Sequence, residues 1–415
     1  MKNKQQKENN MNKIILIGNG FDLAHGLKTG YRDFIEDICR NIFEEILKSG
    51  ETRIYEKENL VTLKMQYKSD NTNGFKDGDI ELKAVLDHAY SEYANIIDIV
   101  LYNHAGELPA PYNKEENLKQ ILKTDTGRLS VYLNCLGKVP EYNNKYKEEI
   151  KIKPYLSIGG FFRRLLESLN LQNWVDVEEE YYTELKECLE GKRDGGIEKL
   201  NEEFFAIKSE LENYLRKIQL SNNISKCSNI YKNIYSVSAF EKASRLLNAS
   251  KEHLLFLNFN YTKTESLYIE HSNNFENIHI HGELDNPNNP IIFGYGDEID
   301  DEYKLIEKEN DNKYLENIKS IKYLETNNYK KLLNFIDSDK YNIFIMGHSC
   351  GISDRTLLNT LFEHENCESI KVFYHKKDDN TDNHSDIIKN IYRNFTNKPL
   401  MRKIVVDKTN SESLT

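Results

Sequence analysis

Four short segments carry glycine or side chains that can bind a ligand or exchange a proton, and each follows an apolar run. They are Gly-Asn-Gly at 18–20, Asn-Tyr-Thr at 260–262, His-Gly at 281–282 and Gly-His-Ser at 347–349. Glycine lets a backbone approach a phosphate closely, an amide both donates and accepts hydrogen bonds, and histidine exchanges a proton near neutral pH. Together these residue types favour a nucleotide site with a base beside it.

Each segment also has a purely structural interpretation. A lone Gly-x-Gly can be a tight turn after a strand, and the dinucleotide fingerprint would need a third glycine where Leu23 stands. Asn260 could cap a following helix, and Asp354 is a natural N-cap for the helix expected after it. The segments alone therefore leave ligand binding and structural roles open.

His279 and His281 lie two residues apart on an expected strand, so their side chains should point to the same face. Such a pair could bind zinc, but the spacing suggests no third ligand, and no metal is expected. The strand should end at Gly282, directly after His281. We therefore interpret His281 as a general base at the edge of the sheet.

Residues 347–351 read Gly-His-Ser-Cys-Gly and match the nucleophile elbow of serine hydrolases letter for letter. That chemistry would also need an acid and a histidine later in the chain, and no candidate lies in a convincing loop after a late strand. The candidates are Asp354, His364, His375 and His384. A serine hydrolase that uses Ser349 stays an alternative.

Buried strands and the helices between them must hold these segments at the edge of a sheet. Apolar runs predict strands at 13–18, 253–260, 277–282, 290–296, 341–349, 369–375 and 403–407. Helical patterns occur at 34–47, 313–335 and 353–363. This alternation predicts an α/β fold with a doubly wound, mostly parallel, Rossmann-like sheet, in which ligands bind beyond the carboxyl ends of the strands.

The pattern changes between residues 51 and 250, where long charged segments carry apolar residues at helical spacing. We expect a large, mostly helical insertion here. The Rossmann-like nucleotide-binding domain would then comprise residues 13–50 and 251–415. Residues 1–12 contain no hydrophobic segment like that of a signal peptide. We expect them to form a disordered polar lead.

The composition limits the partners. The chain has 415 residues and a formal net charge of −11 at pH 7, so it has no overall field that would attract nucleic acid or anionic lipid. Its six cysteines are scattered without metal-binding spacing, which suits a reducing cytoplasm. The apolar runs are far shorter than the ~20 residues that a membrane span needs. We expect a cytoplasmic protein that binds neither membranes nor nucleic acid.

Longer segments around these motifs follow one another between Ile14 and Asp354. They are IGNGFDLAHGL followed by Thr29, Tyr31 and Asp33-Phe34, then NFNYT, HIHGEL, IIFGYG, and GHS followed by Asp354. In this order they resemble the AbiH family of bacteriophage abortive-infection proteins, and NWVDVEEE at 173–180 also resembles a part of that family. The resemblance implies a role in antiviral defence.

A more distant resemblance is to sirtuin-like NAD-binding domains, especially bacterial defence NADases. Those domains carry a Gly-x-Gly opening, an Asn-Tyr-Asp segment, a His-Gly and a late Gly-x-Ser. Here Thr262 stands where an acid is common, and the four-cysteine zinc module of sirtuin deacylases is absent, so protein deacylation is not expected. The resemblance implies a sirtuin-like fold in which NAD is the substrate and is cleaved.

The resemblance also implies residue roles. Asn260 and His281 would be catalytic, with Asn260 orienting the water or the ribose and His281 accepting a proton. Asp22 or Asp33 would contact the nicotinamide ribose or the amide, and Ser349 the adenosine side. The residues that would bind NAD are Gly18, Asn19, Gly20, Phe21, Asp22, Thr29, Tyr31, Asp33, Gly347, His348, Ser349 and Asp354.

The implied function is an antiphage effector that hydrolyses NAD+ to nicotinamide and ADP-ribose. A lethal NADase must be restrained until infection, so a phage-derived activator or a homo-oligomer could be its partner, and the insertion is the candidate for either role. The alternative is that the protein is not an enzyme but a sensor that binds a nucleotide without cleaving it.

Overall fold

The chain divides into two compact units. The computed structural model describes residues 11–48, 54–68, 76–77, 142–143, 151–172, 176–221, 225–238, 253–269, 275–296, 298, 302–377 and 381–415. Met1–Gly30 and Leu215–Thr415 form one unit, called here the parallel-sheet unit, and Tyr31–Tyr214 form the other, the inserted unit. The domain boundaries expected near residues 50 and 250 stay a prediction, because compactness does not show which segments fold independently.

The parallel-sheet unit is built on five strands. They are β1 (Asn12–Ile17), β7 (Leu254–Asn258), β8 (Phe275–His279), β9 (Tyr341–Met346) and β10 (Cys367–Phe373). All neighbours are parallel, in the order β10-β9-β1-β7-β8, which confirms the predicted α/β class with a parallel sheet. After β8 the chain returns to the other side of β1, so the winding reverses between β1 and β9. Ligands of open α/β sheets bind beyond the carboxyl ends of strands at such a reversal.

Strand β1 is buried along its whole length because its alternate side chains enter two hydrophobic cores. Ile14 and Leu16 belong to one core, and Ile15 and Ile17 belong to the other. A strand buried on both faces needs a continuous apolar run, which is what the sequence shows. The strand begins at Asn12, the last residue of the expected disordered lead, and residues 1–10 lie outside the described residues.

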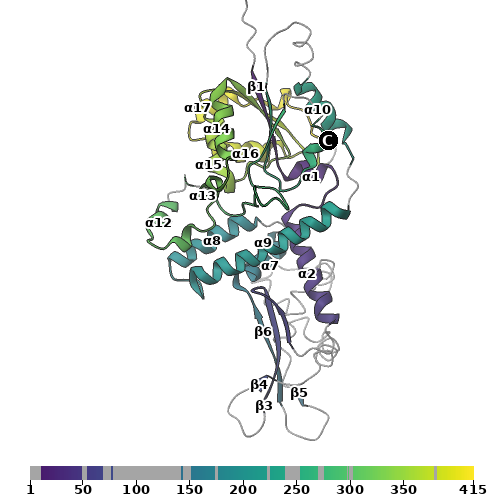
Figure 1. Cartoon of the computed structure of the whole chain (residues 1–415), viewed down its shortest axis with the longest axis vertical. Helices are drawn as coiled ribbons and strands as arrows, with labels where there is room; N and C mark the ends of the chain where they lie inside the picture. The colour runs from purple at the N-terminus through teal and green to yellow at the C-terminus, as the bar shows by residue number, and fades with distance from the viewer. Residues whose placement is uncertain are drawn as a thin grey trace, which may run out of the picture. The chain divides into compact units, whose positions relative to one another are not determined.

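Helices cover both faces of this sheet. The first core contains residues of α14 (Asn328–Ser338), α15 (Arg355–Phe362), α16 (His384–Asn394) and α17 (Lys398–Ile404). The second contains residues of α1 (Asn19–Ala24) and α10 (Ser228–Ser238). Figure 1 shows α14–α17 on one side of β1 and α1 with α10 on the other. The shorter helices of this unit are η1 (Thr264–Leu267), α12 (Tyr303–Lys308), η2 (Asn312–Leu315), α13 (Lys319–Lys322), η3 (Tyr323–Glu325), η4 (Ile352–Asp354) and η5 (Lys408–Asn410).

The prediction of strands at 290–296 and 403–407 is wrong. Residues 290–296 form only one bridge, between Tyr295 and Ile318. Residues 403 and 404 end α17, and only Val405 beyond it makes a bridge, with Ile370. Both runs are apolar because they help to bury the core, and burial alone does not distinguish a strand from a loop or helix.

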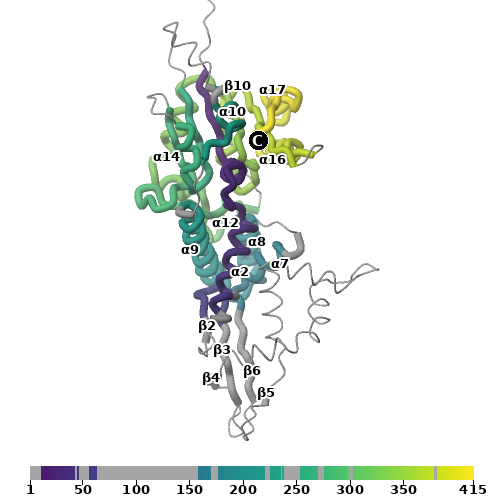
Figure 2. The backbone as a smooth tube through the Cα atoms, turned by 90° about the vertical axis from the view of Figure 1, so that its right-hand side faces the viewer, coloured from purple at the N-terminus to yellow at the C-terminus, as the bar shows by residue number. Residues whose placement is uncertain are grey.

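The described part of the inserted unit contains four long helices and an antiparallel sheet. The helices are α2 (Tyr31–Lys48), α7 (Gly160–Gln172), α8 (Val177–Leu189) and α9 (Gly196–Ser221), of which α9 belongs to this unit up to Tyr214. Figures 1 and 2 show α2 next to α9, where the rings of Phe34 and Tyr214 contact with centroids 5.7 Å apart. In the part of the chain that the structure describes, no helix is both long and apolar enough to cross a membrane.

The inserted unit contains an antiparallel sheet, which the expectation of a mostly helical insertion did not include. Its strands run in the order β2 (Ile54–Lys57), β3 (Val61–Lys68), β6 (Lys151–Ile158) and β5 (Tyr142–Asn143), and β4 (Lys76–Asp77) pairs with β3. Strands β3 and β6 pair from Val61 with Ile158 to Lys68 with Lys151. The described part of the insertion is therefore mixed α and β.

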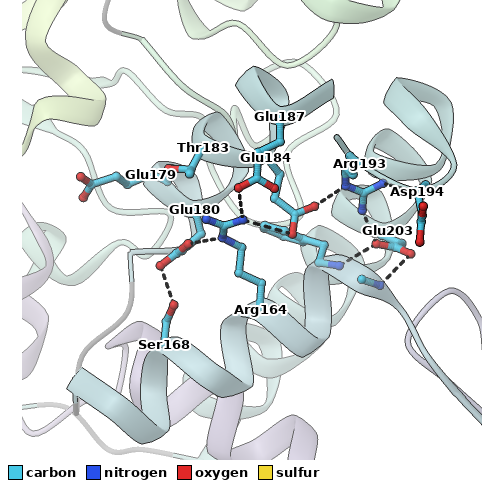
Figure 3. A network of polar contacts seen from close by, with 12 residues as sticks. Arg164, Ser168, Glu179, Glu180, Thr183, Glu184, Glu187, Arg193, Asp194 and Glu203 are labelled. Carbon is cyan, nitrogen blue, oxygen red and sulfur yellow. Dashed lines mark hydrogen bonds and ion pairs between the residues drawn. The ribbon is translucent and has the colours of Figure 1, made fainter. Parts of the chain in front are cut away.

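A network of charged side chains joins α7, α8 and α9 (Figure 3). Glu203 of α9 accepts two backbone N–H groups at the start of α7, at 3.1 and 2.8 Å, and pairs with Arg193 at 2.7 Å. Arg193 also pairs with Glu184 of α8. Arg164 of α7 pairs with Glu180 of α8 at 2.7 Å. Because the side chains of Arg193, Glu184 and Glu203 are buried, each depends on its partners for compensation of its charge.

Candidate functional site

Loops after four neighbouring strands bring predicted residues to one edge of the sheet. Gly18 follows β1, Asn260 follows β7, His281 follows β8 and His348 follows β9, each within two residues of the strand end. The strands are parallel, so these loops all lie at the carboxyl edge. Direct contacts join them there.

Glycines allow the loops after β1 and β9 to touch backbone to backbone. The N–H of Gly20 donates to the carbonyl of Gly347 at 2.7 Å. A Cβ on Gly18 would lie 2.5 Å from Cα of His348, and a Cβ on Gly347 would lie 2.1 Å from the nitrogen of Phe21. No side chain fits at such distances. The Gly-Asn-Gly segment thus forms the N-cap and first residues of α1, and it also fixes the loop carrying His348.

Asn260 joins the loops after β7 and β1. Its side-chain amide donates to the carbonyl of Gly18 at 3.0 Å, and its backbone N–H donates to Oδ1 of Asn258 at 2.8 Å. Asn260 is not a helix cap, because the N-cap of η1 is Lys263. The amide is therefore buried and held in one orientation beside the glycine loop.

Asp22 lies next to Asn260 and has a carboxylate oxygen without a partner. Its Oδ2 accepts from the hydroxyl of Thr262 at 2.5 Å, whereas Oδ1 has no hydrogen-bond partner among the described residues. Burial raises the pKa of Asp22 to about 6, against the lowering effects of Thr262, Thr264 and Asn260, and the charge of Glu265 adds to the rise. With this pKa Asp22 is mostly ionised at pH 7, and because it is only 1% exposed it is shielded from water.

His279 is part of a buried ion pair. Its Nε2 donates to Oε1 of Glu265 at 2.9 Å, and its Nδ1 faces the carbonyl of Asn260 at 3.3 Å. Burial lowers the pKa of His279, but the hydrogen bond and charge of Glu265 outweigh burial, so the net pKa is raised. The two acceptors account for His279 without a metal. Within the described ranges, no group of three or more His, Cys, Asp or Glu side chains is placed to hold a metal ion.

His281 pairs with a different carboxylate, that of Asp354. Its Nε2 lies 3.2 Å from Oδ1 of Asp354 and 3.1 Å from the hydroxyl of Tyr323. A nitrogen beside a carboxylate carries the proton, because two lone pairs would repel each other. The lone pair of His281 therefore falls on Nδ1. Asp354 occupies the expected N-cap position of α15, but its side chain makes no capping hydrogen bond there.

Asp354 is the centre of a buried cluster with Lys319 and His348. Nζ of Lys319 lies 2.8 Å from Oδ1 of Asp354, and Nε2 of His348 lies 3.5 Å from Oδ2. Nδ1 of His348 accepts the N–H of Cys350 at 2.9 Å, which leaves its proton on Nε2, facing the carboxylate. Burial raises the pKa of Asp354, but Lys319 and His281 outweigh burial and hold it well below its ordinary value.

The same cluster keeps His281 neutral. Burial lowers the pKa of His281, the charge of Lys319 lowers it further, and Asp354 opposes them without reversing the shift. The ring of Phe259 contacts the rings of both histidines, with centroids 5.0 Å from His281 and 4.3 Å from His348. A neutral imidazole with its lone pair on Nδ1 can accept a proton at neutral pH.

Other predicted binding residues occupy different positions. The hydroxyl of Thr29 donates to the side chain of Asn19. Phe21 has no exposed surface and lies in the second hydrophobic core, so packing accounts for it. Tyr31 and Asp33 lie in the first turn of α2 and belong to the inserted unit. Whether these residues bind NAD stays a prediction.

The surroundings of Ser349 argue against a serine hydrolase. In a nucleophile elbow the strained residue of the turn is the serine itself, but here the positive φ, 56°, belongs to Cys350. Ser349 is exposed, while His364 and His375 bond to other side chains and the ring of His384 packs against a tyrosine.

Sequence reasoning missed Lys319, Tyr323 and Glu265. Lys319 and Tyr323 lie in the segment IKSIKYLE, whose pattern is that of an ordinary amphipathic helix. No feature of the sequence distinguishes the buried Lys319 from the more exposed Lys322 on the same helix. Glu265 has one signal, its place in the Thr-x-Thr-Glu segment after Asn260.

Fold and site define an α/β protein with buried acid–base pairs at the carboxyl edge of a parallel sheet. Residues 14–376 match the family described as "Bacteriophage abortive infection AbiH". The chain therefore belongs to the AbiH family, which confirms the prediction from the motif order. No curated protein and no solved structure gave a match. The segment at 173–175, which contributes to the resemblance, lies outside the described residues.

Proposed function

We propose that this chain is an abortive-infection effector that acts in the cytoplasm by hydrolysing NAD+ to nicotinamide and ADP-ribose. Membership of the AbiH family supports the abortive-infection role. The reversal of winding beside β1 supports a Rossmann-like arrangement for binding a nucleotide. The choice of NAD rests on the resemblance of the motif order to sirtuin-like domains.

The pair of His281 and Asp354 is the observation that carries the proposal. The pair is buried at the carboxyl edge of the sheet, and it leaves the lone pair of a neutral histidine on Nδ1. The partners of Asp354 fix this state, since Lys319 balances its charge. A base prepared in this way suits the removal of a proton from water or from a ribose hydroxyl.

The proposed reaction is attack of water on C1′ of the nicotinamide ribose. The bond between C1′ and the nicotinamide nitrogen breaks, its electron pair leaves with a neutral nicotinamide, and a new C–O bond forms. The transition state resembles an oxocarbenium ion, as in glycoside hydrolysis. Asn260 would orient the water or a ribose hydroxyl, and Nδ1 of His281 would accept the proton of the water.

Asp22 would stabilise the positive charge that develops on the ribose. Its pKa of about 6 leaves it mostly ionised at neutral pH, and its Oδ1 makes no hydrogen bond to any described residue. A buried carboxylate interacts strongly with a nearby positive charge, because little water screens it. Thr262 would hold the other oxygen, Oδ2, in place.

The test is release of nicotinamide and ADP-ribose from NAD+ by the purified protein, alone and with lysate of phage-infected cells. The lysate is needed because a lethal NADase must await a trigger, for which we propose a phage-derived activator or a homo-oligomer. Wild type should release both products in equal amounts, and Asn260→Ala and His281→Ala should each reduce the rate by about 100-fold or more.

His364→Ala is the control variant. His364 lies away from the site, in ring contact with Tyr341 at the amino end of β9, so this variant should keep the wild-type rate. Absence of release by wild type under both conditions would contradict the proposal. Tight binding of NAD without release would then favour a nucleotide-binding sensor.

A further inference from the structure

Lys319 is a lysine without exposed surface. Its backbone N–H donates to the carbonyl of Tyr295 at 2.9 Å. A Cβ added to Gly296 would lie only 3.3 Å from the Cβ of Lys319. Its Nζ lies 2.8 Å from Oδ1 of Asp354 and 3.4 Å from the carbonyl of Ser353. Burial of an ammonium group is costly unless it is paired. Here Asp354 balances the charge of Lys319, while the contacts of its backbone and Cβ hold the residue in place.

Lys319 and His281 share the same oxygen atom, Oδ1 of Asp354. The distances are 2.8 Å from Nζ of Lys319 and 3.2 Å from Nε2 of His281. With His281 neutral, the cluster holds one cation and one anion. Protonation of His281 would place two cations beside one carboxylate, away from water, so it requires a lower pH than protonation of an imidazole in water.

Among the described residues, four titratable or charged groups face His281, each from a different segment. They are Tyr323 from η3, Lys319 from α13, Asp354 from η4 and His348 from the loop after β9. Of these four, Asp354 alone favours the charged form of His281. Without Lys319, only burial and His348 would oppose the attraction of this carboxylate for a proton on His281.

We propose that Lys319 is a positioning residue, which balances the charge of Asp354 and thereby keeps His281 neutral with its lone pair on Nδ1. This inference rests on the proposed function in one respect, namely that His281 acts as the base. Lys319 itself need not touch the substrate. Its effect on His281 exists whether or not the protein cleaves NAD+.

The test is the pKa of His281, measured by NMR titration of the full chain with 13C-labelled histidine. Comparison with His281→Ala assigns the resonance. Lys319→Met keeps the length of the side chain and removes the charge, so the pKa of His281 should rise by about 1–3 units. Lys319→Arg keeps the charge and should change this pKa by less than about 0.5 unit.

Lys322→Met is the matched control. Lys322 lies on the same helix and pairs with Glu325 at 2.9 Å near the surface, so its loss should leave the pKa of His281 unchanged. An unchanged or lowered pKa in Lys319→Met would overturn the inference. Should that variant fail to fold, Asp354→Asn tests the cluster from the other side. It leaves Lys319 unopposed, so the pKa of His281 should fall, and a rise would overturn the inference.

A pH profile of NAD+ cleavage separates this inference from the proposed function. In Lys319→Met, the acid limb of kcat/KM should move to higher pH by about the same 1–3 units, and activity should recover toward wild type at high pH. A merely structural defect would lower activity at every pH. If wild type cleaves no NAD+, the proposed function fails, while the NMR titration still decides the role of Lys319.

Discussion

At the scale of single residues, the described part of the carboxyl edge of the parallel sheet carries two buried ion pairs and a buried carboxylate, Asp22, without such a partner. Glu265 pairs with His279, and Asp354 pairs with Lys319. Asp22 instead faces neutral hydroxyl and amide groups, and its Oδ1 has no partner among the described residues. An ionised group in such a place lowers stability, so a functional reason for its presence is expected.

The first prediction concerns the stability cost of Asp22. Its pKa is raised from 3.8 to about 6 in the folded state, so the folded state binds the proton more tightly than the unfolded state. The free energy of unfolding therefore falls as pH rises through this window, in total by about 3 kcal/mol. Asp22→Asn avoids this loss. Its stability advantage over wild type should grow by about 1 kcal/mol from pH 5 to pH 8 in urea unfolding.

Comparison with wild type at each pH removes the contributions of other titrating groups, which both proteins share. An advantage that stays constant or shrinks between pH 5 and pH 8 would show that Asp22 is not destabilised by its charge. The same variant should reduce NAD+ cleavage, if Asp22 stabilises charge on the ribose.

The sequence could indicate which residues reach the carboxyl edge, but not how they pair there. Asn260, His281 and His348 each follow a recognisable buried strand, so their place was predictable. The pairing of His281 with Asp354 depends on two loops that meet only in the folded chain. Lys319 could not be predicted, because its burial comes from contacts with segments distant in sequence.

At the scale of elements, the loops after β1 and β9 form one piece, since their backbones touch. Gly347 has a φ of 83°, and a Cβ there would lie 2.1 Å from the nitrogen of Phe21. Gly347→Ala should therefore lower the free energy of unfolding by about 2 kcal/mol or more, and should also reduce activity. Urea unfolding measures the first effect, and NAD+ cleavage the second.

Gly351→Ala provides the comparison within the same segment. A Cβ on Gly351 would have no neighbour closer than 3.6 Å, and its φ of −62° suits any residue. This variant should change stability by less than about 0.5 kcal/mol. Equal effects of the two substitutions would mean that the close approach of the loops does not exist in solution.

In the inserted unit, Glu203 holds the start of α7 and Arg193 together. Glu203→Ala would leave Arg193 without one partner and the helix start without its acceptor. We expect a loss of about 3–5 kcal/mol in stability of this unit, measured by hydrogen exchange of α7 in the full chain. Glu202→Ala, at the exposed neighbouring position, should have little effect. Similar exchange in both variants would contradict a structural role for Glu203.

Elements with a regular pattern and a buried surface were the most predictable. All five strands of the parallel sheet overlap predicted runs, and β1 and β7 are buried along their whole length and therefore mostly apolar. Strand β3 was missed although Val61, Leu63, Met65 and Tyr67 alternate with polar residues, the pattern of a half-buried strand. Its partner β6 lies far along the chain, and local helical spacing on both sides favoured a helix.

At the scale of the whole molecule, the chain leaves the parallel sheet after β1 and returns to the adjacent strand. β1 and β7 pair in register from Lys13 with Leu254 to Ile17 with Asn258, so the long excursion between them does not disturb the sheet. The contacts around Asp22, Asp354 and Glu265 involve residues of the parallel-sheet unit. We therefore propose a different role for the inserted unit, which would restrain or assemble the effector.

The NAD+ concentration of infected cells tests the central claim most directly. Cells that express wild type should lose most of their NAD+ after phage infection and before lysis, and should release fewer phage. Cells that express His281→Ala at the same level should keep their NAD+ and lose protection, whereas His364→Ala should behave as wild type. Protection by wild type with an unchanged NAD+ concentration would contradict the claim that this chain defends cells by hydrolysing NAD+.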